Sequence, residues 1–154
     1  MKKLMLFTVI LSLPFLQACE ENPVEKTYKD ISGVVQKGPF LNGTNISLYT
    51  LDENMGQTGE TYSTQISDNA GSFSISNIAL SSNFVEFVAT GFYYNEVTDE
   101  TSGSQLTLLG LADLSDHTTL NVNLITHLTK NRIITLMEEG RIFPEAKVQA
   151  CREL

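Results

Sequence analysis

The chain has 154 residues, of which 18 are acidic and 10 are basic, so its formal net charge is −8 at pH 7. Hydrophobic residues make up 42% of the sequence, which is enough to fill the core of one domain. Nucleic acids bind basic surfaces through their phosphates, so a chain this acidic is not expected to bind nucleic acid.

The N-terminal segment has to be separated from any folded domain. Lys2 and Lys3 provide a positive start, residues 4–13 form an almost continuous apolar run, and Pro14 ends that run. A transmembrane helix needs roughly 20 apolar residues, and this run is too short to cross a bilayer. The pattern is typical of a cleaved export signal.

The apolar run is followed by Leu16-Gln17-Ala18-Cys19, which resembles the lipobox of bacterial lipoprotein precursors. In that family the Cys thiol is alkylated by lipid before the signal peptide is cut. The resemblance implies a signal peptide over residues 1–18, a diacylglyceryl group on Cys19, and residence on a membrane of the bacterial envelope, with the outer membrane expected. The alternative is an ordinary secretory signal cut after Ala18, although the preceding residues fit the A-x-A preference of such sites poorly.

Residues 19–30 are predicted to be the lipidated Cys and a flexible tether, because this stretch is polar and contains Pro23. The pair Glu20-Glu21 resembles the surface-export signals of Bacteroidetes-type lipoproteins, and its alternative interpretation is a solvated linker. With Cys19 acylated, Cys151 has no partner within the chain, so no intramolecular disulfide is expected.

From residue 31 the sequence changes to short β-rich runs separated by turn residues. In Ser72–Ser76 apolar and polar residues alternate with period two, and Asp68-Asn69-Ala70-Gly71 is a strong turn signal before it. Strands are expected at 31–37, 46–51, 61–67, 72–76, 84–94, 105–111 and 119–124. Such short strands without intervening helices predict a mainly β fold, a seven-strand antiparallel β-sandwich over residues 31–124.

After Leu124 the apolar period becomes helical, which predicts a helical segment over residues 125–154. Gly140 is placed as the C-terminal cap of one helix, and Pro144 opens another. The last amphipathic repeat reaches Leu154 without a cap, so we expect either a frayed helix or a longer protein.

Two stretches carry a family likeness. Ser32-Gly33-Val34-Val35 and Ile66–Phe73 resemble the carboxypeptidase regulatory-like, or transthyretin-like, sandwich, in which an Asp-x-x-Gly-x-Phe turn joins two central strands. Val35–Phe40 and Ile125–Lys130 are similar to segments of Bacteroidetes-type surface lipoproteins, in which helices and often a longer C-terminal region follow the sandwich. The resemblance implies a non-catalytic accessory module.

The polar residues offer little for chemistry. Asp113, Asp116 and His117 could hold a metal ion, but a dedicated site for a hard cation needs more oxygen ligands, so a solvated turn is the preferred interpretation. His127 lies beside Leu124 and Leu128 on the expected helix and is interpreted as structural. No catalytic residue, metal ligand or cofactor is therefore predicted.

Phe92-Tyr93-Tyr94 is the cluster chosen as a possible ligand contact, because exposed aromatic rings can stack on sugars. Strand alternation, however, places at least one of these rings in the core. The sequence thus favours a lipid-anchored, non-catalytic structural or binding module with a protein or glycan partner. The alternatives are the accessory N-terminal domain of a longer envelope enzyme and a glycan-binding module.

Overall fold

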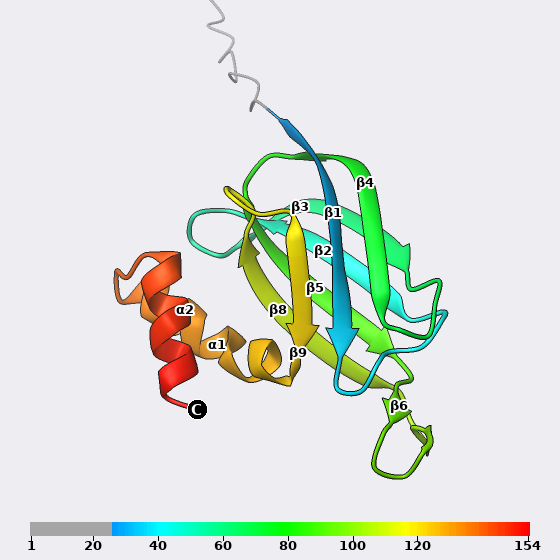
Figure 1. Ribbon diagram of the computed structural model, residues 1–154. Helices are drawn as coiled ribbons and strands as arrows, with labels where there is room; N and C mark the ends of the chain where they lie inside the picture. The colour runs from blue at the N-terminus through cyan, green and yellow to red at the C-terminus, as the bar shows by residue number, and fades with distance from the viewer. Residues whose placement is uncertain (1–25) are drawn as a thin grey trace, which may run out of the picture.

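A computed structural model describes residues 26–154 (Figure 1). The predictions for Cys19, the lipobox at Leu16, Gln17 and Ala18, and the signal peptide therefore lie outside the described residues. The described chain is mainly β with two C-terminal helices, which confirms the predicted fold class at this level.

The strands form a three-stranded sheet of order β4-β1-β9, a four-stranded sheet of order β3-β2-β5-β8, and a small hairpin of β6 and β7. Their bounds are β1 Thr27–Gln36, β2 Asn45–Leu51, β3 Gln57–Gln65, β4 Ser72–Leu80, β5 Phe84–Gly91, β6 Tyr94–Asn95, β7 Glu100–Thr101, β8 Leu106–Asp113 and β9 Thr119–Asn123. Figure 1 shows the two larger sheets lying against each other.

The main core fills the space between these sheets. Strand β5 alternates buried Val85, Phe87 and Ala89 with half-buried residues, because successive side chains of a strand point to opposite faces. The ring of Phe87 meets that of Phe73 from β4 at a centroid distance of 5.9 Å. Ile31 of β1 belongs to the same buried cluster, so both sheets contribute to one core.

A second core joins the helices to the outer face of the four-stranded sheet. Helix α1 (Leu124–Glu138) and helix α2 (Phe143–Arg152) bury Ile133, Leu136 and Phe143 against Leu51 and Leu111 of the sheet. The outer face of this sheet is thus apolar where the helices cover it. No helix of the described residues is both long and apolar enough to cross a membrane.

Polar contacts fix the helices in place. Asn123 and Thr126 form a capping box at the start of α1, with the Asn123 amide N–H donating to Thr126 Oγ1 at 2.9 Å. Gly140 has a φ of 93° just after α1 ends, which confirms the predicted glycine cap. Arg132 of α1 donates to Glu153 at 2.6 Å and ties the two helices together. This bond, with one from Gln149, lowers the pKa of Glu153 to about 2.

The prediction of a wholly antiparallel sandwich is wrong at one pair, because β9 runs parallel to β1 from the pair Ser32–Thr119 to the pair Gln36–Asn123. The chain leaves β8 in the four-stranded sheet, crosses through residues 114–118, and enters the other sheet beside β1. Alternation in the sequence identifies the two faces of a strand and not its direction relative to a neighbour.

The predicted tether is wrong over residues 27–30, which belong to β1. Lys29 donates to the carbonyl of Leu114, and Asp30 accepts the amide of Asn77 at 2.7 Å, so polar side chains stabilise this part of the strand. The register of β1 against β4 shifts between Lys29 and Ile31, because β4 has one more residue there, and the burial alternation of β4 breaks at Asn77. The predicted strand over 72–76 likewise continues to Leu80.

The predicted strand over 84–94 ends earlier, at Gly91. A Cβ atom on Gly91 would lie 2.0 Å from Thr44 Oγ1, and the amide of Leu41 donates to the carbonyl of Phe92, so the chain turns onto the preceding loop. The turn at Asp68–Gly71 joins β3 to β4, and both are edge strands. The implied position of this turn between two central strands is therefore wrong.

Replacing Thr50 with Val is expected to stabilise the protein. Thr50 is fully buried and its hydroxyl has no hydrogen-bond partner among the described residues, so its desolvation is not compensated. We expect Thr50→Val to raise the free energy of unfolding by about 1 kcal/mol in urea titrations. Thr50→Ser keeps the hydroxyl and loses the methyl group, so it should destabilise; a loss of stability in Thr50→Val would contradict this account.

Candidate functional site

Strand β1 runs between two poles of the molecule (Figure 1). The entry pole lies where the chain enters β1 at Thr27. The far pole contains the loop over residues 37–44, the β6–β7 hairpin and the start of α1 at Leu124. The possible ligand contacts predicted at Phe92–Tyr94 lie at the far pole.

Tyr93 is held by its neighbours at the far pole. Its ring stacks on the buried ring of Phe40 at a centroid distance of 6.0 Å. Lys37 Nζ lies 4.2 Å from the centroid of the Tyr93 ring and donates to its hydroxyl at 2.6 Å. These contacts are a cation–π interaction and a hydrogen bond, and they give Tyr93 a structural role in fixing the loop over residues 37–44.

The Tyr94 side chain is held within the β6–β7 hairpin, because its hydroxyl donates to Asp99. This hydrogen bond raises the pKa of Tyr94. The backbone of Gly38 lies close to the carbonyl of Tyr94, since a Cβ on Gly38 would come within 1.9 Å of that oxygen. Phe92 is the most exposed of the three, at 42%. The three aromatic residues are adjacent in sequence, but each has different neighbours in the structure.

The turn at Asp68 uses its carboxylate internally. Asp68 Oδ1 accepts the amides of Ala70 at 2.9 Å and Ser72 at 3.1 Å. Hydrogen bonds from the backbone, first that of Ser72 and then that of Ala70, lower the pKa of Asp68. Gly71 has a φ of 81°, and its carbonyl accepts the amide of Val35 at 2.9 Å. These contacts explain the predicted turn as a structural element.

The entry pole has an ion pair that the sequence patterns did not indicate. Lys26 Nζ lies 2.8 Å from Glu60, and the second oxygen of Glu60 accepts the Ser81 hydroxyl at 2.7 Å. Partial burial acts to raise the pKa of Glu60, but the bonds from Lys26 and Ser81 lower it overall. The start of β1 is thereby attached to the loop that follows β4.

His127 was interpreted as structural from the sequence, and the structure shows a hydrogen-bond partner that the sequence did not indicate. Its Nδ1 accepts the amide of Leu109 at 3.3 Å, and Thr126 Oγ1 donates to the Leu109 carbonyl at 3.1 Å. Both Leu109 groups belong to the outer edge of β8, so two side chains of α1 take the place of a neighbouring strand. The spacing of polar residues on α1 could not identify this partner, because Leu109 is distant in sequence.

Asp113, Asp116 and His117 line one cavity of about 220 Å³ beside α2. Phe143, Pro144 and Lys147 form its other wall. Asp113 Oδ1 accepts the amide of Ser115 at 2.9 Å. Within residues 26–154 no three His, Cys, Asp or Glu side chains are grouped so that they could hold a metal ion.

Comparisons with family models, with curated proteins and with solved structures find no match for this chain.

Asp68→Ala is expected to lower the urea midpoint at neutral pH, because the amides of Ala70 and Ser72 lose their acceptor. Asp68→Asn keeps an oxygen acceptor and removes the charge, so its loss should be smaller. The folded pKa of Asp68 lies below its ordinary value of 3.8, so its charge stabilises the protein above that pH. This contribution is lost as pH falls through the folded pKa, and the difference between wild type and Asp68→Asn should shrink accordingly. A constant difference down to about pH 2 would contradict this explanation.

His127→Ala should expose the β8 edge and lower the free energy of unfolding by about 1 kcal/mol. The Leu109 amide should also exchange faster with solvent deuterium, because it loses its acceptor. His127→Asn places an oxygen near the position of Nδ1 and should preserve most of the protection. Unchanged exchange at Leu109 in the alanine variant would show that the bond is not formed in solution.

Proposed function

We propose that this chain is a bacterial envelope lipoprotein, anchored through Cys19, whose β-rich domain serves as a non-catalytic structural or binding module. The sequence Leu16-Gln17-Ala18-Cys19 after a short apolar run is the observation that carries the proposal. A diacylglyceryl group contributes about 0.8 kcal/mol for each buried methylene, so two acyl chains would hold the protein durably on a membrane.

The position of β1 supports a polarised arrangement. Thr27 begins β1 at the entry pole, so residues 20–26 would connect Cys19 to that pole. Lys26 and Lys29 bond to other parts of the domain, to Glu60 and to the Leu114 carbonyl, which ties the incoming chain to the fold. The anchor would then lie at one pole, with the loop over 37–44 and the β6–β7 hairpin at the opposite pole.

We further infer that the two larger sheets form a seven-strand sandwich of the transthyretin-like kind. The shared core between the sheets supports this inference. So does the bond from the Tyr62 hydroxyl of β3 to the Ala79 carbonyl of β4 at 2.5 Å, which closes one side of the two layers. The parallel pair β1–β9 and the turn between two edge strands are departures from the expected pattern.

The bonds made by the polar candidates support a non-catalytic role. Asp68, His127 and Asp113 each accept a backbone amide, and these contacts explain the residues as parts of turns and of a strand edge. A general base would instead direct its acceptor atom toward a substrate position. The proposed role of the domain is therefore to bind a partner.

Metabolic labelling with palmitate tests the anchor directly. Wild-type protein should incorporate the label and partition with membranes, whereas Cys19→Ala should do neither. Cys151→Ala is the matched control, because Cys151 is the other cysteine of the chain and is exposed, and it should label normally. Label retained by Cys19→Ala and lost by Cys151→Ala would overturn the assignment.

The intact mass of the acylated protein from native membranes distinguishes the complete module from a longer enzyme. A mass equal to residues 19–154 plus acyl groups supports a small module. A much larger acylated mass would keep the anchor and favour the accessory domain of a longer envelope protein.

A further inference from the structure

The four edge strands of the two sheets differ in how their outer hydrogen-bonding groups are protected. The β4 edge receives the Tyr62 hydroxyl, and the β8 edge is covered by Thr126 and His127. Strand β3 is made irregular by Gly59, which has a φ of 90°, and by a register shift against β2. Such irregularities discourage the pairing of an additional strand. Among the residues that the structure describes, strand β9 has no comparable protection at the positions before Asn123.

The parallel pairing of β9 with β1 determines which backbone N–H and C=O groups of β9 point away from the sheet. The amide of Ser32 donates to the carbonyl of Thr118 at 3.0 Å, so Leu120 and Val122 direct their backbone groups toward β1. The intervening residues Thr119 and Asn121 direct their N–H and C=O groups to the other side. Across residues 26–154 we find no partner for these outward groups, whereas the next outward residue, Asn123, is bonded by Thr126. The outward N–H and C=O groups of Thr119 and Asn121 are therefore available to pair with another strand.

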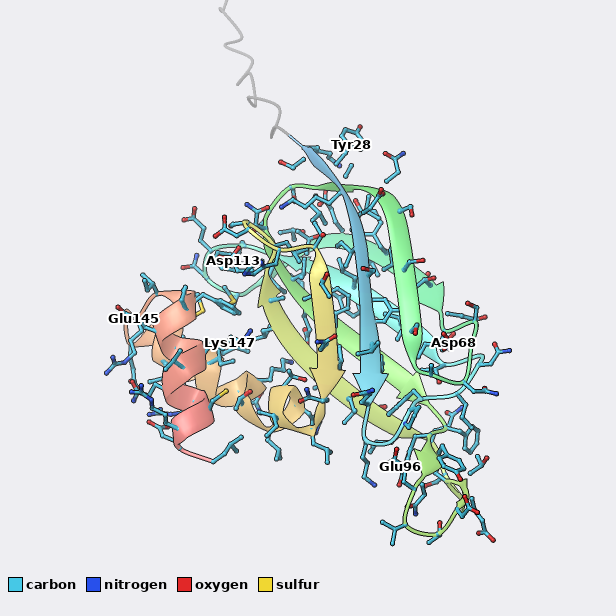
Figure 2. The ribbon with its side chains drawn as sticks, viewed as in Figure 1. Tyr28, Asp68, Glu96, Asp113, Glu145 and Lys147 are labelled. Carbon is cyan, nitrogen blue, oxygen red and sulfur yellow. The ribbon has the colours of Figure 1, made fainter. Side chains whose placement is uncertain are left out.

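A trough runs along this open edge, beneath α2. It consists of the cavity of about 220 Å³ that Thr119 and Leu120 line and a second cavity of about 240 Å³ bounded by Asn123 and Cys151. Lys147 of α2 lines both cavities and so lies between them. Phe143 and Ala112, both nearly buried, give the first cavity an apolar floor. Figure 2 labels Lys147 on α2 and Asp113 at the end of β8, and both residues line the first cavity.

The charged residues that line the trough bear on which occupants it could bind. Lys147 forms no ion pair within the described part of the chain. Asp113 and Asp116 line the first cavity beside it, whereas no carboxylate lines the second, so a carboxylate of an occupant would complement Lys147 from the second cavity. Residues of α2 and of β9 line both cavities, so an occupant of the trough would lie between the helix and this edge. Extended peptides bind such edges by main-chain hydrogen bonds, with side-chain pockets supplying selectivity.

We propose that the β9 edge binds an extended peptide segment of a partner protein, which adds as a strand beside Thr119 and Asn121. An apolar side chain of the segment packs on Phe143 and Leu120, and an acidic side chain pairs with Lys147. This inference deepens the proposed function by naming the partner class of the binding module. It is tested in solution on unlipidated protein, so its failure would be separate from a failure of acylation at Cys19.

The probe is an acetylated hexapeptide, Thr-Val-Glu-Val-Thr-Val, titrated to about 1 mM, which detects even weak complexes. Binding should protect the amides of Thr119 and Asn121 from deuterium exchange and shift their NMR signals. Asn121→Pro removes one outward N–H without touching the ladder to β1, so it should weaken binding about tenfold or more. Asn121→Ala is the matched control, because it keeps the N–H, and it should bind like wild type.

The lysine is tested in the same titration. Lys147→Gln should weaken binding several-fold, and so should replacing the peptide Glu by Gln, with no further loss when both changes are combined. Arg152→Gln on the same helix is the control and should have no effect. No protection of Thr119 and Asn121 at about 1 mM peptide, or equal binding by Asn121→Pro and Asn121→Ala, would overturn the proposal. Light scattering that shows a dimer abolished by Asn121→Pro would assign the edge to a second copy instead.

Discussion

The parallel pairing of β9 with β1 is the constraint on which the arrangement of the other elements depends. Because the two strands run in the same direction, both end at the far pole, and α1 must begin there at Leu124. Helix α1 then passes along β8, and α2 returns beside it. The close approach of the strands requires Gly33, since a Cβ at that position would lie 1.7 Å from the Leu120 carbonyl oxygen. No other residue type has room at this contact.

Side chains, more than additional strands, close the sides of the two layers. Tyr62 bridges β3 and β4, while Thr126 and His127 satisfy both backbone groups of Leu109 on β8. The helices therefore do more than cover an apolar face, because their polar residues complete the hydrogen bonding of a sheet edge. This arrangement explains a half-buried histidine without invoking catalysis. Strand β9 differs, because within residues 26–154 no side chain of either helix bonds its outward groups at Thr119 and Asn121.

Local chemistry accounts for the parts of the fold that were predictable from sequence. Alternation located most strand interiors, such as Phe73 and Ile75 on one face of β4, and Gly140 and Pro144 correctly indicated the end of α1 and the start of α2. The Asp68 turn was predictable because its carboxylate bonds backbone amides two and four residues ahead. Each of these signals is contained within a short stretch of chain.

The features that were missed depend on residues far apart in sequence. The direction of β9 is decided by the crossing of residues 114–118 between sheets, and the early start of β1 by bonds from Lys29 and Asp30 to Leu114 and Asn77. The trough combines Asp113 of β8, Thr119 of β9 and Lys147 of α2, and no pattern in the sequence relates these positions. Of the aromatic cluster, only the prediction that one ring reaches the core could be made locally, and Tyr93 packs there against Phe40.

The central position of β1 also determines how the domain would bear a mechanical load. A pull on the chain before Thr27, directed along β1, acts on the ladders to β4 and β9 together. The hydrogen bonds of these ladders lie across the direction of pull, so they are loaded in shear and share the force instead of opening one at a time. A domain held by its N-terminal end would consequently resist extraction by tension far better than it would if its first strand lay at a sheet edge and could be peeled away.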